Sequence, residues 1–244
     1  MDERPRFVQY FKAKKVTIEM ARDRGYEISE LEKRFLTMEF EQFWLYYLEK
    51  SGKGTFDYAF FDREHRTEIR ETVRTKDPNT ETVTETEKIT VKVLVFKFAP
   101  KSLGKTFGIE SAKEFLAEMK DTPGDIRTGI LIIGQQLSNK AKAALEDKLP
   151  FKIQIFQLNL LQYNPTKHMF APKYRIMTNR EQREFLKANG IKIKELPLMS
   201  IEDPIARYFG LENGRIVEKT VSHFVGETMT DSIIEYSVVE NTPL

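Results

Sequence analysis

At residues 91–98 the chain reads Val-Lys-Val-Leu-Val-Phe-Lys-Phe, an apolar run rich in β-branched and aromatic residues that is typical of a strand. Residues 111–120 then place apolar side chains at helical spacing, which predicts a helix. The apolar run at residues 129–134 predicts a buried strand. Strand, helix and strand in this order predict a crossover unit.

Further elements extend this unit in both directions. Ser138 is placed to cap a helix that runs to Leu145, and residues 151–156 alternate like a strand. Towards the N-terminus, a first helix is predicted by apolar residues at helical spacing and by basic residues before a stop at Gly25. Its apolar residues are Phe7, Phe11, Ile18 and Ala21. We therefore expect residues 1–163 to form one α/β domain with a mixed sheet and flanking helices.

The segment after the first helix is rich in aromatic residues. Ser29 and Glu32 have the spacing of a capping box, which predicts the start of a helix. An apolar stripe follows, made of Phe40, Phe43, Trp44, Tyr47 and Leu48. We interpret this stripe as core packing, because aromatic residues that stack on bases usually lie on open sheets or in grooves.

Residues 62–90 are dense in Thr, Glu and Arg. Lys76-Asp-Pro-Asn79 has the composition of a turn, and the stretches on either side are strand-like. This pattern predicts a polar, solvent-exposed hairpin. We interpret its charged residues as a solvated face rather than a binding site.

The pattern changes after Tyr163-Asn-Pro165, which has the composition of a connector. Thr178 and Glu181 form a second capping box, and the helix that they start stops at Gly190. We therefore expect a second domain to begin at Asn164.

The rest of this second domain contains a short helix and two strands. Asp203 followed by proline predicts a capped helix that ends at Gly210. Residues 215–221 and 232–239 are expected to be paired strands. Residues 164–244 therefore form a small α+β domain in this interpretation, and the whole chain is expected to be a two-domain α+β protein.

The composition excludes several classes of function. The 39 basic and 37 acidic residues give a net charge of +2; residues 164–244 contain 11 of each, which leaves 28 and 26 for the first domain. The absence of cysteine excludes thiol catalysis, and three scattered histidines argue against a zinc cluster, so no metal or cofactor is expected. We also expect no membrane span and no secretory signal, and hence a protein that stays inside the cell.

One segment fits a phosphate-binding loop. Residues 99–106 match a relaxed P-loop in which alanine replaces the first glycine and Lys105 and Thr106 close the motif. In a working P-loop these last two residues lie at the start of a helix, whereas residues 107–109 intervene here. A P-loop-like phosphate-binding enzyme therefore stays an alternative. No other catalytic motif is present, and we predict no catalytic residue.

Four lysines near predicted turns and helix starts are candidate contacts to a phosphate backbone, because helix N-terminal amides lie close to them. They are Lys101, Lys105, Lys140 and Lys142. Ordinary surface lysine is the alternative interpretation.

The predicted helix after Asp203 carries Arg207 and Tyr208, two residue types that are favoured as interface anchors. A capped helix packed on a sheet is an equally good interpretation of this segment. His168 lies beside the apolar residues Met169 and Phe170, near the domain boundary. This sequence context favours a structural histidine.

Several of these segments resemble one family, the fifth shared subunit of the eukaryotic nuclear RNA polymerases, whose C-terminal domain corresponds to a small subunit of the archaeal RNA polymerase. The family signature Leu-Pro…Asp-Pro-Val-Ala-Arg-Tyr-Phe-Gly…Gly-x-x-Val is similar to Leu196-Pro197, Asp203-Pro-Ile-Ala-Arg-Tyr-Phe-Gly210, Gly214 and Val217. Upstream, Asn164-x-Thr166-x-His168-x-x-x-Pro172 resembles the family segment Asn-Ile-Thr-x-His-x-Leu-Val-Pro.

The resemblance continues into the first domain. Asp23-Arg-Gly-Tyr26 resembles the end of the family's first helix, and Thr128-Gly-Ile130 resembles a family strand. The chain departs from the family at Tyr174, where a second histidine is usual, and at Leu198, which replaces an arginine. The family's basic strand and turn become the longer, less basic segment 218–231. These departures indicate a divergent relative.

The resemblance implies a non-catalytic subunit of a multisubunit DNA-directed RNA polymerase. Residues 164–244 would be an assembly domain that docks on the largest subunit. Residues 1–163 would be a jaw domain near downstream duplex DNA, and the four lysines named above are the candidate DNA contacts of this domain. The residues implied in docking are His168, Pro172, Pro197, Asp203, Pro204, Arg207 and Tyr208.

The implied location is the nucleus, or the cytoplasm or virion if the chain is viral. The other implied partners are the remaining core subunits. A free-standing transcription regulator that carries a polymerase-docking domain is the main alternative, and the sequence does not say which polymerase is served.

Overall fold

The computed structural model describes residues 4–51, 63–76, 83–99, 106–146, 149–168, 171–225 and 228–241. It consists of two compact units, Met1–Gln162 and Tyr163–Leu244. Both units combine helices with a mixed sheet, which confirms the α+β fold class. Within the described ranges, no helix is long and apolar enough to cross a membrane.

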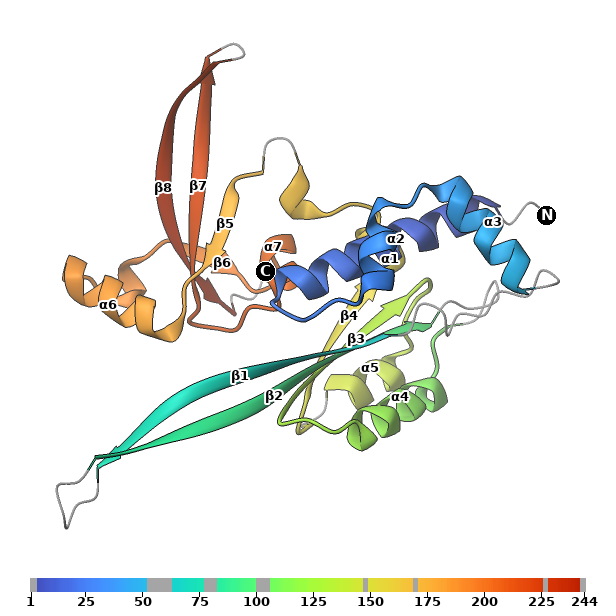
Figure 1. Ribbon diagram of the computed structural model, residues 1–244, viewed down its shortest axis with the longest axis horizontal. Helices are drawn as coiled ribbons and strands as arrows, with labels where there is room; N and C mark the ends of the chain where they lie inside the picture. Colours follow the sequence, from blue (N-terminus) through green and yellow to red (C-terminus); the bar gives the residue numbers. More distant parts are fainter. Residues whose placement is uncertain are drawn as a thin grey trace. The chain divides into compact units, whose positions relative to one another are not determined.

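The first unit is a four-stranded sheet with helices on both faces (Figure 1). Its elements are α1 (Arg4–Asp23), α2 (Glu30–Thr37), α3 (Phe40–Ser51), β1 (Arg63–Lys76), β2 (Val83–Ala99), α4 (Ile109–Asp121), β3 (Ile126–Ile133), α5 (Asn139–Glu146), β4 (Lys152–Gln157) and the 3₁₀ helix η2 (Leu158–Leu161). The strand order is β1-β2-β3-β4. Strands β2, β3 and β4 run parallel, and β1 is antiparallel to β2.

The predicted crossover is confirmed, and it explains why the central strands are apolar throughout. Val93 and Val95 of β2 pack with α4 and α5, whereas Leu94 and Phe96 face the opposite side of the sheet, where α1 lies (Figure 1). All four side chains are buried. A strand covered on both faces reads as a continuous apolar run.

The predicted polar hairpin is present as β1 paired with β2. The prediction that this hairpin and the strand at residues 91–98 are separate elements is wrong. Strand β2 is one continuous element of 17 residues, and its distal half pairs with β1 as far as Val83. No glycine or proline interrupts residues 83–99, so nothing ends the strand between its polar and apolar halves. Strand β3 joins β2 only from Lys92 onward. The predicted turn lies mostly outside the described residues.

The aromatic stripe is core, as predicted. Phe43 is fully buried, and its ring centroid lies 5.2 Å from that of Phe11 on α1 and 5.6 Å from that of Phe35 on α2. The rings of Phe7 and Trp44 meet edge to face at 4.9 Å. These rings hold α1, α2 and α3 together. The side chains of Tyr47 and Leu48 fall outside the described part of the chain.

A buried pair that the sequence analysis missed joins the helices to the sheet. His65 Nε2 on β1 lies 2.9 Å from Glu32 Oε1 on α2, and the two side chains are only 3% and 7% exposed. Burial raises the pKa of Glu32, but hydrogen bonds from His65, the Ser29 backbone N–H and the Ser29 hydroxyl lower it to about 2 overall. The carboxylate therefore serves both the predicted capping box and this long-range contact.

The depressed pKa of Glu32 predicts a loss of stability in acid. A carboxyl with a lower pKa in the folded state stabilises the fold above its ordinary pKa of 4.5, and this contribution disappears as the pH falls towards 2. The contribution is about 3 kcal/mol at neutral pH. Glu32→Gln should remove it, so that the variant's free energy of unfolding falls less between pH 5 and 2.5 than that of the unmodified protein.

Urea unfolding followed by the fluorescence of Trp44, the single tryptophan of the chain, measures this difference in the first unit. Glu114→Gln, on the exposed side of α4, is the matched control and should follow the unmodified protein. Identical pH dependence in Glu32→Gln and the unmodified protein would refute the role of the pair.

The second unit is a smaller mixed sheet with one long helix against it. Its elements are η3 (Pro165–Lys167), β5 (Lys173–Ile176), α6 (Asn179–Asn189), η4 (Ile193–Glu195), β6 (Leu198–Ser200), α7 (Pro204–Phe209), β7 (Ile216–Val225) and β8 (Thr228–Glu240). The strand order is β5-β7-β8-β6, with β6 parallel to β8 and the other pairs antiparallel.

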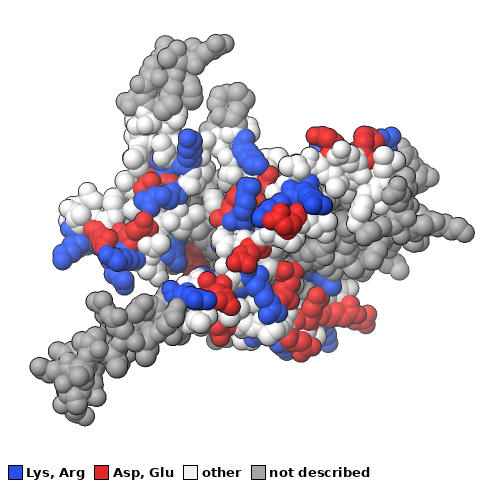
Figure 2. Space-filling model, in the orientation of Figure 1, with Lys and Arg blue, Asp and Glu red and all other residues white. Residues whose placement is uncertain are grey.

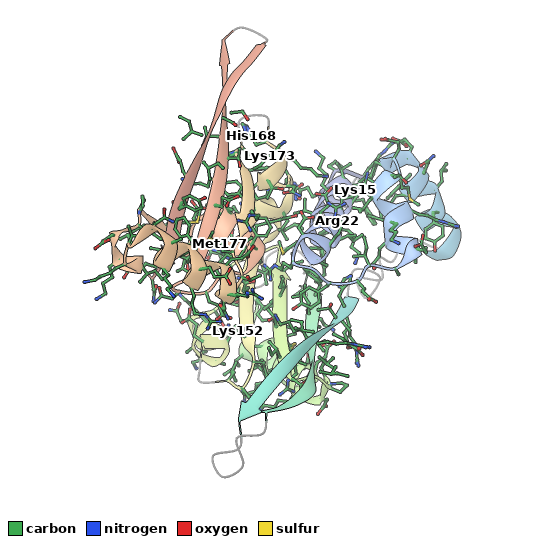
Figure 3. The ribbon with its side chains drawn as sticks, turned by 60° about the vertical axis from the view of Figure 1, so that its left-hand side comes forward. Lys15, Arg22, Lys152, His168, Lys173 and Met177 are labelled. Atoms are coloured by element: carbon green, nitrogen blue, oxygen red, sulfur yellow. The ribbon has the colours of Figure 1, made fainter. Side chains whose placement is uncertain are left out.

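The local signals that predicted α6 are confirmed. Thr178 and Glu181 form the capping box, and Gly190 ends the helix with φ of 64°, a left-handed conformation that favours glycine. Phe185 and Leu186 of α6 pack against the core of the unit, which contains Met177, Leu196, Ile216 and Val238. Met177, labelled in Figure 3, directly follows β5 and precedes the N-cap of α6.

Candidate functional site

The site suggested by the sequence centres on α7, a short helix in the second unit. Asp203 Oδ1 accepts a hydrogen bond from the backbone N–H of Ile205 at 2.8 Å, and Pro204 occupies the first turn. Gly210 ends the helix with φ of 65°. The predicted cap and stop are therefore both confirmed.

Backbone hydrogen bonds hold the segments around α7 against strand β8. The Val238 N–H donates to the carbonyl oxygen of Pro197 at 2.8 Å, just before β6, and the Ile201 N–H donates to that of Glu240 at 3.0 Å. After the helix, the Gly214 N–H donates to the carbonyl oxygen of Val239 at 2.8 Å. The segments before and after α7 are thus both bonded to the end of β8.

A buried side-chain network joins α7 to the beginning of the unit. The Asn164 Nδ2 group donates to Tyr208 Oη at 2.9 Å, and Asn164 Oδ1 accepts from the backbone N–H and the hydroxyl of Thr166 at 2.9 and 2.7 Å. Asn164 is 6% exposed and Tyr208 is 1% exposed. Two segments 44 residues apart, both singled out in the sequence, therefore form one structure.

This geometry corrects the expectation that Tyr208 is an exposed interface residue. Its ring is among the largest fully buried side chains of the described chain, and it meets the ring of Phe209 edge to face at 5.3 Å. The apolar body of tyrosine is buried here because its hydroxyl finds a partner in Asn164. Tyr208 therefore positions α7 rather than presenting a side chain at the surface.

Arg207, the neighbour of Tyr208 on α7, reaches the surface instead. Its side chain is 28% exposed, and Nη1 lies 3.2 Å from Glu202 Oε2. The remaining predicted docking residues belong to the segments that flank this helix: His168, Pro197 and Pro204 are exposed or half-buried, as are Pro172 and Asp203. His168 immediately follows η3 and lies close to the start of β5 at Lys173 (Figure 3).

Two of the four lysines proposed as DNA contacts lie within the described residues. Lys140 and Lys142 are exposed near the start of α5, where Ser138 caps the helix as predicted, and Lys142 Nζ lies 3.8 Å from Glu146 Oε1. Lys101 and Lys105 lie outside the described residues. Figure 2 shows acidic and basic side chains interspersed over the described surface on the face drawn, without a continuous basic patch.

The P-loop alternative gains no support from the described residues around it. Helix α4 begins at Ile109, after an N-cap at Gly108, so Thr106 precedes the helix. Phe107 is 2% exposed and forms an isolated parallel β-bridge with Leu137. The Phe107 N–H donates a hydrogen bond to the carbonyl oxygen of Gln136 at 3.0 Å. This anchored residue separates the motif from the helix start, where a phosphate would be bound. Among the described residues, no group of three metal-ligating side chains is found.

Comparisons with known proteins match the second unit, which contains α7, to a known domain family. Residues 163–234 match the family model described as RNA polymerase Rpb5, C-terminal domain. The chain is 27% identical over 220 residues to DNA-directed RNA polymerases IV and V subunit 5B of Arabidopsis thaliana, which covers 90% of this chain and 86% of that one.

Two further relatives extend this picture. DNA-directed RNA polymerase V subunit 5A of Arabidopsis thaliana is 28% identical over 231 residues, or 95% of this chain and 88% of that one. The DNA-directed RNA polymerases I, II, and III subunit rpabc1 of Dictyostelium discoideum is 33% identical over 114 residues, or 46% of this chain and 57% of that one.

The two-unit α+β fold and the matched C-terminal residues define a relative of RNA polymerase subunits. More narrowly, residues 163–234 match the C-terminal domain of the Rpb5 family, and the chain is similar along most of its length to subunits 5A and 5B of the plant polymerases.

The Asn164–Tyr208 hydrogen bond predicts that Tyr208→Phe loosens α7. The substitution keeps the buried ring but removes the hydroxyl that accepts from Asn164, and leaving a buried amide without this partner costs about 1–3 kcal/mol. Hydrogen exchange measured by mass spectrometry should show faster exchange in peptides that cover 164–168 and 204–211. Tyr163→Phe, at a side chain that is 62% exposed, is the control and should leave exchange unchanged. Equal exchange in the two variants would contradict the anchoring role.

Proposed function

We propose that this chain is a structural subunit of a multisubunit DNA-directed RNA polymerase. The observation that carries the proposal is the match of residues 163–234 to the Rpb5 C-terminal domain, within a chain that aligns along most of its length with polymerase subunits. The structure adds that Asn164 and Tyr208, from separate motif segments, are joined in one buried network.

Each of the two units has its own role in this proposal. The second unit docks on the largest polymerase subunit through the surface around α7, where Arg207, Pro197 and Pro204 lie. The first unit forms a jaw near downstream duplex DNA, with Lys140 and Lys142 among its contacts. The protein acts in the nucleus and has no catalytic residue of its own. The absence of cysteine and of a complete catalytic motif in the sequence supports this last point.

The near-neutral charge of the chain supports a DNA contact that depends on the assembled enzyme. Affinity for duplex DNA rises with the number of phosphates that basic residues neutralise. The net charge is only +2, and described acidic and basic side chains are interspersed on the face shown in Figure 2. We therefore assign tight DNA binding to the polymerase and not to this chain alone.

Affinity purification of the tagged full-length chain from its native source, with a high-salt wash and quantitative mass spectrometry, tests the proposal. A core subunit should recover the two largest polymerase subunits in equimolar amounts. Recovery of the chain alone, or with only traces of polymerase, would contradict the proposal and would favour a free-standing transcription regulator.

Lys140→Glu tests the DNA contact in the assembled polymerase. The substitution replaces one phosphate contact by a repulsive charge, so retention of downstream duplex DNA should weaken. The slope of log affinity against log salt should become less steep by about 1. Lys113→Glu, at another exposed lysine, on α4, is the control and should bind DNA like the unmodified enzyme. Equal retention of DNA by both variants would remove Lys140 from the contact surface.

A further inference from the structure

The two compact units meet along the chain at a single residue, Tyr163. Before it, Leu161 ends the 3₁₀ helix η2 and is only 2% exposed. The Gln162 side chain then donates from Nε2 to the carbonyl oxygen of Leu158 at 2.7 Å and to that of Gln9 at 3.4 Å. The chain is therefore anchored to the first unit up to Gln162.

After Tyr163, the chain is anchored to the second unit at once. Asn164 is 6% exposed, and its side chain is hydrogen-bonded to Tyr208 and to Thr166. Its backbone torsions, φ of −83° and ψ of 118°, are extended, as expected for a residue before proline, because Pro165 disfavours the helical region at this position. The anchored ends of the two units are therefore separated by one residue.

Tyr163 itself is held by few interactions. Its side chain is 62% exposed, and the residue lies outside every helix and strand. Within the described part of the chain, Tyr163 makes no hydrogen bond, ion pair or ring contact. With planar peptide bonds on both sides, its φ and ψ are the two soft torsions at this junction.

So short a junction differs from an ordinary linker. Domain boundaries usually lie in flexible segments rich in glycine, proline or polar residues, whereas residues 158–164 contain no glycine and are anchored on both sides of Tyr163. A long flexible linker lets two domains move independently. A junction of one residue instead transmits a rotation through two torsions, which is the behaviour of a hinge.

We propose that Tyr163 is the hinge of this protein, so that a change in its φ and ψ turns the first unit as a rigid body relative to the second. The hinge is inferred from the contacts of Leu161, Gln162 and Asn164. Its consequence rests on the proposed function: while the second unit stays docked on the polymerase, a turn at Tyr163 moves the jaw relative to downstream DNA.

The absence of cysteine makes the hinge directly measurable. Lys113→Cys on α4 and Lys187→Cys on α6, both at exposed positions, each accept one spin label, so that each unit carries one. Pulsed electron paramagnetic resonance of the full-length chain gives the distribution of distances between the two labels. The labelled pair is combined with Tyr163→Gly, because glycine adopts backbone torsions that tyrosine rarely adopts.

Two control variants carry the same labels. Tyr163→Phe keeps the backbone preferences of the hinge residue, and Leu160→Gly places a glycine at a 54% exposed residue of η2, outside the hinge. The proposal predicts that Tyr163→Gly widens the distance distribution about twofold, whereas both controls match the unmodified chain. Equal widths in Tyr163→Gly and the unmodified chain would overturn the proposal, as would an equal widening in Leu160→Gly.

Affinity purification of the unlabelled variants from the native source separates the hinge from the proposed function. Tyr163→Gly should recover the polymerase subunits as the unmodified chain does, but the polymerase should retain less downstream duplex DNA. Equal DNA retention would overturn the role of the hinge in the jaw. If the unmodified chain recovers no polymerase, the proposed function falls, whereas the distance distributions still decide the hinge.

Discussion

The hydrogen bond between Asn164 and Tyr208 is the buried side-chain contact that joins the start of the second unit to helix α7. Asn164 lies at the start of this unit, and Tyr208 lies in the six-residue helix α7. So short a helix has little stability of its own; its cap, its glycine stop, this buried bond and the backbone bonds of its flanking segments to β8 hold it in place. Arg207 lies on a helix whose neighbouring Tyr208 side chain is buried in the unit.

The first unit follows a different constraint. Its central strands are buried on both faces, which requires helices on each side of the sheet. The aromatic rings of α1, α2 and α3 form one cluster, and the pair of His65 and Glu32 joins that cluster to the sheet. A buried carboxylate is tolerated there because hydrogen bonds to its charged form more than offset the cost of burial.

Local signals in the sequence predicted most helices well, because capping boxes, glycine stops and apolar spacing act within a few residues. The boxes at Ser29 and Thr178 and the stops at Gly190 and Gly210 are examples. Features set by distant residues could not be predicted in this way. Nothing near Tyr208 shows that its hydroxyl will meet Asn164, and β5 and β6 are too short to have a recognisable pattern of their own.

The central claim is that the second unit of this chain holds it on a polymerase, and chemical cross-linking of the native complex tests it most directly. The purified polymerase is treated with a lysine-reactive cross-linker, and linked peptides are identified by mass spectrometry. We expect links from Lys192 and Lys194 to the largest subunit, because these exposed lysines lie at η4, in the segment that leads to β6 and α7. Polymerase links confined to residues 1–162, or none at all, would contradict the claim.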